Sequence, residues 1–328
     1  MRALTQIENY LIHEFIEDFD DGLLSRRGLV RRVIGITGGV ATAATALAAM
    51  GVTPMTRAEA RQSATPAAPT AQSPLSVAAD DPRITSAAIS FSGNDTTLLA
   101  YEAKPAGASG PLPLVMVCHE NRGLTDHIRD VVRRWAVEGY LAVAVDLLSR
   151  EGGTDAIADP ADAPGLLTQD VDMNRHVGDF RATLDYYLGQ GQIIDPNQVG
   201  MQGFCFGGGV TWRAAEQLPE LKAAAPFYGP PPPLDQVGAI KAAVLGVYSA
   251  DPSDFANEGR DELETALTEA GVTFEFKIYP DTQHAFHNDT GQRYNETQSV
   301  AAWNDTVAWF AEYILGTTMA TPEATPAP

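Results

Sequence analysis

Two hydrophobic patterns alternate along the chain between residues 84 and 316. Short apolar runs, such as the unbroken run at 112–118, are typical of strands buried on both faces of a parallel sheet. Longer segments, such as 170–188, place apolar residues at helical spacing. This alternation predicts repeated βα units, and therefore an α/β fold whose mainly parallel sheet is flanked by helices on both faces. The predicted strands are 84–91, 96–103, 112–118, 141–145, 198–202, 223–228, 242–248 and 273–279, and the predicted helices are 126–138, 170–188, 208–217, 256–270 and 297–315.

The first sixty residues have a different pattern. Five apolar residues between 11 and 19 fall on one helical face with acidic residues around them, which predicts a short amphipathic helix without an assigned role. Arg26 and Arg27 then precede a mildly apolar stretch at 33–52, an order that resembles a twin-arginine export signal. We therefore expect the export machinery as a partner and a location beyond the cytoplasmic membrane. The alternative is a permanent membrane anchor through 33–52.

Composition sets the predicted boundaries. Residues 1–60 form the signal region, with a small-x-small cleavage site at Ala58–Glu59–Ala60, and residues 61–81 form a linker rich in Ala, Pro and Thr. A single folded domain is expected at 82–316, followed by a disordered tail at 317–328.

Charge and cysteine content exclude several classes of function. The formal net charge of −20 repels nucleic-acid phosphates, so no nucleic-acid partner is expected. Two cysteines, Cys118 and Cys205, cannot form a disulfide framework, and their spacing fits no metal-binding pattern. We expect a monomer.

The strongest chemical signal is the string Gly203-Phe204-Cys205-Phe206-Gly207-Gly208. It lies between a predicted strand and a predicted helix, which is the nucleophile-elbow pattern with Cys in place of Ser. The sharp turn strains the nucleophile's backbone, and the flanking glycines allow the strand and helix to cross closely. The helix N-terminus then faces the thiol, where it favours negative charge. Read without that context, the same string could be a buried thiol in a tight turn.

A nucleophile needs a base and a group that orients the base. His284 and His287 are the only histidines after Cys205, and His284 is preferred because it lies in the loop directly after the strand at 273–279. Asp251 and Asp254 both follow the strand at 242–248. Asp251 comes first after the strand and is the predicted acid, whereas Asp254 could be the N-terminal residue of the next helix.

The loop after the strand at 112–118 is predicted to complete the site. Its position suggests that the backbone N–H of Asn121 pairs with that of Phe206 to form an oxyanion hole. Glu120 beside the thiol would be a buried carboxylate that needs a partner, either Arg122 or the Cys–His pair. No third ligand is spaced to complete a metal site with His119 and Glu120.

At these residues the sequence resembles the dienelactone hydrolase family over about 84–316. Glu120, the Cys205 elbow, Asp251 and His284-Ala285-Phe286 match the family's motifs in order. The resemblance implies a cofactor-free α/β-hydrolase that opens lactones or cleaves esters through an acyl-thiol intermediate. It also implies that Glu120 gates the thiol by holding it until substrate binds.

One departure concerns substrate recognition. Asn288 stands where the type enzyme has an arginine for the substrate carboxylate, and 151–169 offers no second one; Arg175 and Arg293 could serve from elsewhere. The native substrate is therefore not expected to be the dienelactone of the type enzyme. The leading hypothesis is an ester or lactone hydrolase that acts on a small molecule. The alternatives are an exported binding protein on a hydrolase scaffold, and a tethered cell-envelope protein whose domain serves assembly.

Overall fold

A mixed sheet of eight strands organises the main part of the molecule. The computed structural model describes residue 4 and residues 6–20, 24–50, 52, 73–169 and 173–317. The strand order is β1-β2-β4-β3-β5-β6-β7-β8. β1 and β2 pair antiparallel, β2 pairs antiparallel with β4, and all remaining neighbours pair parallel. The strands are β1 Ile84–Ser92, β2 Thr97–Pro105, β3 Leu112–Cys118, β4 Leu141–Val145, β5 Ile194–Phe204, β6 Leu221–Phe227, β7 Ala243–Ser249 and β8 Phe274–Tyr279.

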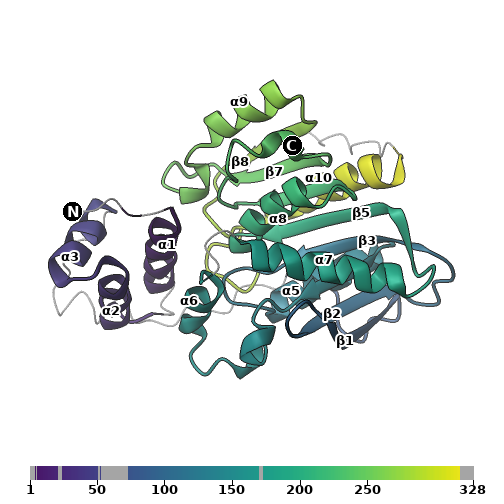
Figure 1. Cartoon of the computed structure of the whole chain (residues 1–328), viewed down its shortest axis with the longest axis horizontal. Helices are drawn as coiled ribbons and strands as arrows, with labels where there is room; N and C mark the ends of the chain where they lie inside the picture. Colours follow the sequence, from purple (N-terminus) through teal and green to yellow (C-terminus); the bar gives the residue numbers. More distant parts are fainter. Residues whose placement is uncertain are drawn as a thin grey trace, which may run out of the picture.

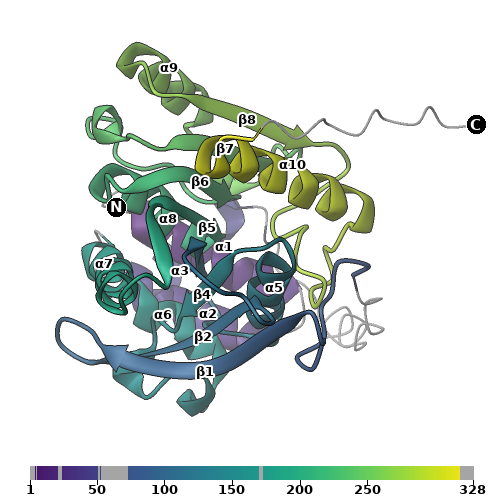
Figure 2. The same cartoon turned by 90° about the vertical axis from the view of Figure 1, so that its right-hand side faces the viewer.

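Helices cover both faces of this sheet, which confirms the predicted fold class (Figures 1 and 2). α5 and α10 lie on one face, and α7 and α8 lie on the other. All five residues of β4 and the last five of β3 are buried, as expected for strands enclosed by helices. The helices are α5 Asp126–Val137, α6 Ala163–Leu167, α7 Asn174–Gly189, α8 Phe206–Gln217, α9 Arg260–Ala270 and α10 Glu296–Leu315. The parallel strands β3, β5, β6, β7 and β8 all end at the same edge, where such folds build their ligand sites.

A separate group of three helices lies beside this domain (Figure 1). The group consists of α1 Gln6–Asp20, α2 Arg26–Thr37 and α3 Val40–Ala49, and α1 is its member nearest to the domain. The group has its own small apolar cluster, which includes Ile12, Phe15, Leu29 and Val33. The amphipathic helix predicted around 11–19 is therefore α1, and its apolar face packs within this group.

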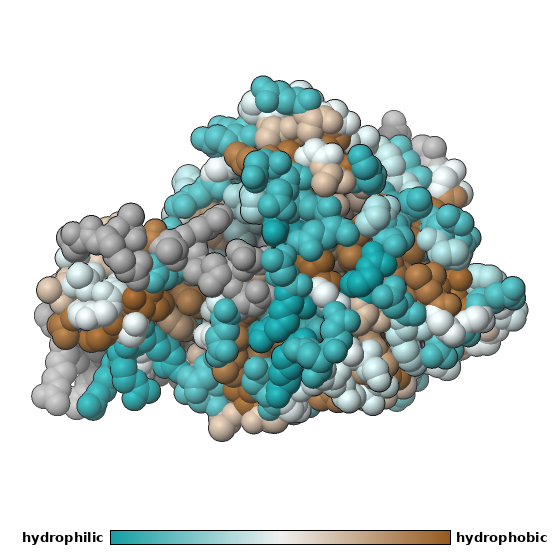
Figure 3. All heavy atoms as spheres, viewed as in Figure 1, coloured by the Kyte–Doolittle hydropathy of each residue, from teal (hydrophilic) through white to brown (hydrophobic). Residues whose placement is uncertain are grey.

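The apolar stretch expected at 33–52 is not one continuous helix. α2 and α3 meet at a bend of 109°, and Gly38 in the left-handed region caps α2. Within the described residues no single helix has the length and apolar character of a membrane span, whereas the bent pair reaches both criteria together. The space-filling view shows hydrophobic atoms on the surface of this three-helix group as well as on the domain (Figure 3).

The folded domain begins earlier than the predicted boundary at residue 82. The amide of Ser73 donates a hydrogen bond of 3.3 Å to Asp289, and the amide of Val77 donates one of 2.7 Å to Asp130. Residues 73–81 therefore belong to the domain rather than to the linker, because buried carboxylates fix their backbone. The composition of residues 73–81 does not show that they belong to the domain, because the groups that bind the carboxylates are backbone amides. The remaining predicted linker, the proposed cleavage site at 58–60 and the tail from 318 lie outside the described residues.

Candidate active site

Cys205 occupies a strained turn between β5 and α8. Its backbone angles are φ 54° and ψ −117°, a region that costs a residue with a side chain about 1–3 kcal/mol. The neighbouring glycines are required by space: a Cβ on Gly203 would lie 2.1 Å from the carbonyl oxygen of Gly207, and one on Gly207 would lie 2.4 Å from that of His119. A hydrogen bond of 3.0 Å from the Cys205 amide to Phe227 holds the turn on the sheet. The local structure is thus the nucleophile elbow that the sequence predicts.

His284 is placed beside this thiol and bonded to a carboxylate. Its Nδ1 lies 2.9 Å from Oδ1 of Asp254, and both side chains are buried. Nδ1–H donating to the carboxylate leaves Nε2 as the ring nitrogen that gains or loses a proton. Nε2 has no hydrogen-bond partner among the described residues. One ligand atom of His284 and the sulfur of Cys205 lie within 4.8 Å of each other, so the two side chains are brought together as predicted.

The predicted acid, Asp251, is wrong as the partner of His284. Its Oδ1 accepts hydrogen bonds from the amide (2.8 Å) and hydroxyl (2.6 Å) of Ser253, which turns the carboxylate into its own loop. Asp254 instead points inward and also accepts from Ser249 Oγ at 2.6 Å. Asp254 additionally caps the short helix η5 (Phe255–Asn257) through Ala256 N, so the two roles weighed for this position coincide. The prediction took the first carboxylate after the strand. In the structure, the turn at residues 251–254 directs the Asp251 carboxylate to Ser253 and the Asp254 carboxylate to His284.

The competing histidine lies elsewhere. His287 is fully buried and stacks on Phe204, with ring centroids 5.2 Å apart, while Phe227 and Trp303 pack around it. Burial lowers the pKa of His287 well below its ordinary value, and the nearby charge of Arg134 acts in the same direction. This neutral ring belongs to the core beneath the site.

Glu120 was expected to hold the thiol, but its carboxylate is bonded to Asn288 instead. Its Oε2 accepts a hydrogen bond of 2.6 Å from Asn288, and its Oε1 is buried with no partner among the described residues. Asn288, which stands where the resemblance to the type enzyme predicts an arginine, thus binds the carboxylate next to the site. The charge of Glu120 still contributes to raising the pKa of the Cys205 thiol. Arg122, weighed as its ion-pair partner, pairs with Asp18 instead.

The two expected oxyanion donors come from the start of α8 and from the loop after β3. Phe206 is the first residue of α8, where the N–H has no acceptor within the helix. Asn121 lies in the loop after β3, which His119 fixes by donating from Nδ1 to Glu120 O (2.6 Å) and accepting at Nε2 from Leu147 N (3.0 Å).

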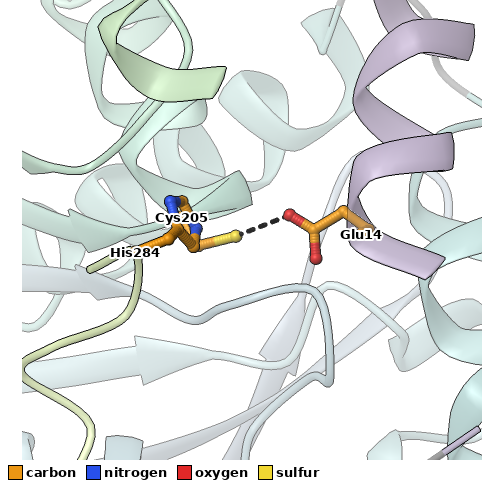
Figure 4. Close-up of side chains that lie close together, drawn as sticks. All are labelled: Glu14, Cys205 and His284. Atoms are coloured by element: carbon orange, nitrogen blue, oxygen red, sulfur yellow. Dashed lines mark hydrogen bonds between the residues drawn. The ribbon is translucent and has the colours of Figure 1, made fainter. Parts of the chain in front are cut away.

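Two residues that no motif predicted reach the thiol from α1. Cys205 Sγ donates a hydrogen bond of 3.0 Å to Oε1 of Glu14 (Figure 4). The hydroxyl of Tyr10 lies 3.6 Å from the same sulfur, and the side-chain amide of Asn121 donates to the other oxygen of Glu14. The amphipathic pattern of α1 predicted a helix with acidic residues, but nothing in the chain shows which surface such a helix covers.

Burial and neighbouring charges together set the pKa values of this cluster. Burial raises the pKa of the Cys205 thiol well above its ordinary value, and the adjacent Glu14 raises it further. Burial and the charge of Glu17 raise the pKa of Glu14 to about 7. For His284, burial lowers the pKa, but the charges of Glu17 and Asp254 outweigh it and raise the value to about 9. With Glu14 in place, the sulfur is therefore a neutral thiol.

Glu14, Cys205 and His284 also form a set of potential metal ligands. One ligand atom from each lies within 4.8 Å of the others, and all three residues are buried. Carboxylate, thiolate and imidazole are ligands that Zn²⁺ accepts. Here the thiol proton already joins Cys205 to Glu14, whereas Nε2 of His284, the ring nitrogen not bonded to Asp254, has no hydrogen-bond partner among the described residues.

Comparison with known proteins gives consistent matches. The model of the "Dienelactone hydrolase family" matches residues 98–314. A "Putative carboxymethylenebutenolidase" of Salmonella typhi is 34% identical over 251 residues, which cover 73% of this chain and 92% of that protein. A protein of the same name from Escherichia coli K12 is 33% identical over 257 residues, covering 74% and 94%.

Solved structures agree with these matches. The "Crystal Structure of Putative Dienelactone Hydrolase from Klebsiella pneumoniae" superposes with a TM-score of 0.65 at 33% identity, covering 70% of this chain and 99% of that one. An acylaminoacyl peptidase from Pyrococcus horikoshii superposes with a TM-score of 0.58 at 14% identity, covering 71% and 42%. This second likeness concerns the fold alone, which is that of α/β-hydrolases.

Proposed function

Because the chain belongs to the dienelactone hydrolase family, we propose that it hydrolyses an ester or lactone through a thioester formed on Cys205. The observation that carries the proposal is the strained Cys205 backbone beside a histidine whose Nδ1 is bonded to a buried carboxylate. That constellation provides a nucleophile, a base and an orienting group in the roles that acyl transfer requires.

In the first half-reaction, Sγ of Cys205 attacks the carbonyl carbon and its proton passes to Nε2 of His284. The backbone N–H groups of Phe206 and Asn121 bind the oxyanion of the tetrahedral intermediate. The intermediate collapses by breaking the carbon–oxygen bond, and the leaving alkoxide takes the proton from His284. In an ester the alcohol departs, whereas in a lactone it remains joined to the acyl group.

In the second half-reaction, His284 takes a proton from water and the resulting hydroxide attacks the thioester. Collapse of this intermediate releases the carboxylic acid, and the sulfur recovers its proton. Asp254 holds the His284 ring in the orientation needed for both steps and stabilises its charged form.

Loss of the nucleophile tests this function. We expect Cys205→Ala to abolish hydrolysis of p-nitrophenyl esters and of simple aryl lactones by the full-length chain. Cys118→Ala is the matched control, since Cys118 is the other free thiol and is buried at the end of β3. Equal and measurable rates of hydrolysis in wild type and Cys205→Ala would refute the function.

We also propose that residues 1–60 direct export of the enzyme. Support comes from the sequence order of Arg26 and Arg27 before an apolar stretch. The test is to fractionate cells that produce the chain or the variant R26K/R27K. Export predicts that the variant accumulates in the cytoplasm, whereas anchoring predicts that both proteins stay with the membrane.

A further inference from the structure

The sulfur that the proposed reaction needs is closed off by α1. Cys205 is 4% exposed, Glu14 is 3% exposed and Tyr10 is 5% exposed. Attack on an ester requires the carbonyl carbon to reach Sγ, and the carboxylate of Glu14 already occupies hydrogen-bonding distance from that atom. With α1 in this position, the site has no room for a substrate at the sulfur.

Three acidic side chains of α1 make the polar contacts with the site. Glu14, Glu17 and Asp18 are three and four residues apart and therefore share one helix face. Glu14 binds the thiol, Glu17 pairs with Arg293 at 2.9 Å, and Asp18 pairs with Arg122.

The partners of these acids come from three loops at the carboxyl end of the sheet. Arg122 follows β3, Cys205 follows β5, and Arg293 follows the segment that holds His284. One acidic helix face therefore contacts all three of these loops.

Apolar contacts add to this interface. The Tyr10 ring packs edge-on against Phe255, with centroids 5.4 Å apart, and lies 6.3 Å from the ring of Phe206. Phe255 also packs on His284, at 4.6 Å between centroids. Tyr10 is thereby part of the main core of the domain, although the other buried apolar side chains of α1 belong to the separate three-helix cluster.

α1 is an addition to the family fold. The family model begins at residue 98, and the solved Klebsiella structure matches over 99% of its own chain but only 70% of this one. A helix that the family fold does not require therefore covers Cys205, the residue that the proposed reaction needs.

We propose that α1 is an intramolecular inhibitor that occupies the active site and must leave before Cys205 can react. The proposal rests on the proposed function of Cys205. Because α1 precedes Arg26 and Arg27 in the chain, any cleavage after the signal region detaches the inhibitor from the enzyme together with that signal. Two of the contacts are ion pairs, and Glu17–Arg293 joins two partly exposed side chains, so a charge change at this pair can weaken the docking of the helix.

The test uses the full-length chain and a charge swap at the pair Glu17–Arg293. Arg293→Glu places two like charges against each other and should release α1. The readout is the rate at which iodoacetamide alkylates Cys205, followed by mass spectrometry of its peptide. If α1 stayed docked, the added negative charge would disfavour the thiolate and slow the alkylation. Release therefore predicts the opposite sign, an increase of about tenfold or more, as expected when about 1.4 kcal/mol of docking is lost.

A double variant with the two charges exchanged distinguishes release of α1 from damage to the fold. In E17R/R293E the pair is restored with its charges exchanged, and alkylation should return to within about twofold of wild type. The matched control is Arg181→Glu, the same substitution on α7, where Arg181 pairs with Glu220 before β6, and it should leave alkylation unchanged. Cys118 reports unfolding, because it is fully buried in β3 and reacts only when the domain opens.

Alkylation in R293E that is no faster than in R181E would overturn the proposal. The proposal would also be overturned if Cys205 in E17R/R293E were alkylated as fast as in R293E, or if the alkylation rate of Cys118 rose together with that of Cys205. The readout does not depend on catalysis, so faster alkylation without any ester hydrolysis would support the inhibitor and reject the proposed function.

Discussion

Oδ1 of Asp254 lies 2.9 Å from Nδ1 of His284, whereas the carboxylate of Asp251 is bonded to Ser253 in the same loop. Two aspartates three residues apart thus face opposite ways, and one of them lies in the reactive cluster. The pair offers a comparison within one loop.

Asp254→Asn should lower kcat/KM for activated esters by about 10³-fold or more, because an amide cannot stabilise the charged imidazole and selects the wrong tautomer. Asp251→Asn, the control in the same loop, should stay within about twofold of wild type. The measurement is steady-state hydrolysis of p-nitrophenyl acetate. A larger loss in D251N than in D254N would return the acid role to Asp251.

The charge of Glu14 should control the ionisation of Cys205. A negative charge beside the sulfur disfavours thiolate, so its removal in Glu14→Gln should shift the alkylation profile of Cys205 to lower pH. We expect the midpoint to move by about one pH unit or more, measured as the iodoacetamide rate from pH 6 to 10. Glu8→Gln, a change on the same helix, is the control. A midpoint in E14Q equal to wild type would show that Glu14 does not govern the thiol.

The buried carboxylate of Asp289 should stabilise the folded protein and take no part in the reaction. Asp289 lies 2.8 Å from Nδ1 of His127 and 3.0 Å from Arg134, and it also accepts from Ser76. Burial raises its pKa, but the His127 hydrogen bond and the charges of His127 and Arg134 outweigh burial and hold the pKa well below the ordinary value. Asp289→Asn should therefore lower the free energy of unfolding near pH 7 by about 3 kcal/mol.

The pH dependence of this effect follows from the direction of the shift. A lowered pKa in the folded state stabilises the protein above the ordinary carboxylate pKa, and this stabilisation disappears as the pH falls through the folded value. The difference in urea stability between wild type and D289N should therefore shrink below about pH 4. Asp81→Asn, at a pair with the exposed side chain of Arg83, should change the unfolding curve far less than Asp289→Asn. A constant difference down to pH 3 would contradict the role of Asp289.

Metal removal distinguishes a hydrogen-bonded thiol from a metal site. If Glu14, Cys205 and His284 act as described, prolonged dialysis against EDTA should leave both hydrolysis and the alkylation rate of Cys205 unchanged. Loss of hydrolysis on dialysis, with recovery on adding Zn²⁺, would assign the cluster of three side chains to a metal.

Local sequence patterns predicted most of the strands and helices of the domain, because burial of apolar runs and the conformational freedom of glycine act over a few neighbouring residues. The apolar run of β3 and the segment of β4 matched to the residue, and the elbow at Cys205 followed from its glycines and its place between strand and helix. The choice between Asp251 and Asp254 failed, because the direction of a side chain in a turn depends on hydrogen bonds that spacing does not encode.

The role of α1 lay beyond any such pattern. Its amphipathic face predicted a helix, but the partners of Glu14, Glu17 and Asp18 are more than a hundred residues away in the chain. A similar reason explains residues 73–81, whose backbone amides bind Asp130 and Asp289. Contacts of this kind arise from the tertiary arrangement, and a single sequence does not reveal them.

The chemical state of Cys205 during turnover tests the account most directly. While p-nitrophenyl acetate is being hydrolysed, rapid acid quenching followed by mass spectrometry should find one acetyl group on the peptide that holds Cys205, and none on the peptide that holds Cys118. Continued hydrolysis with Cys205 unmodified at every time point would contradict a thioester mechanism.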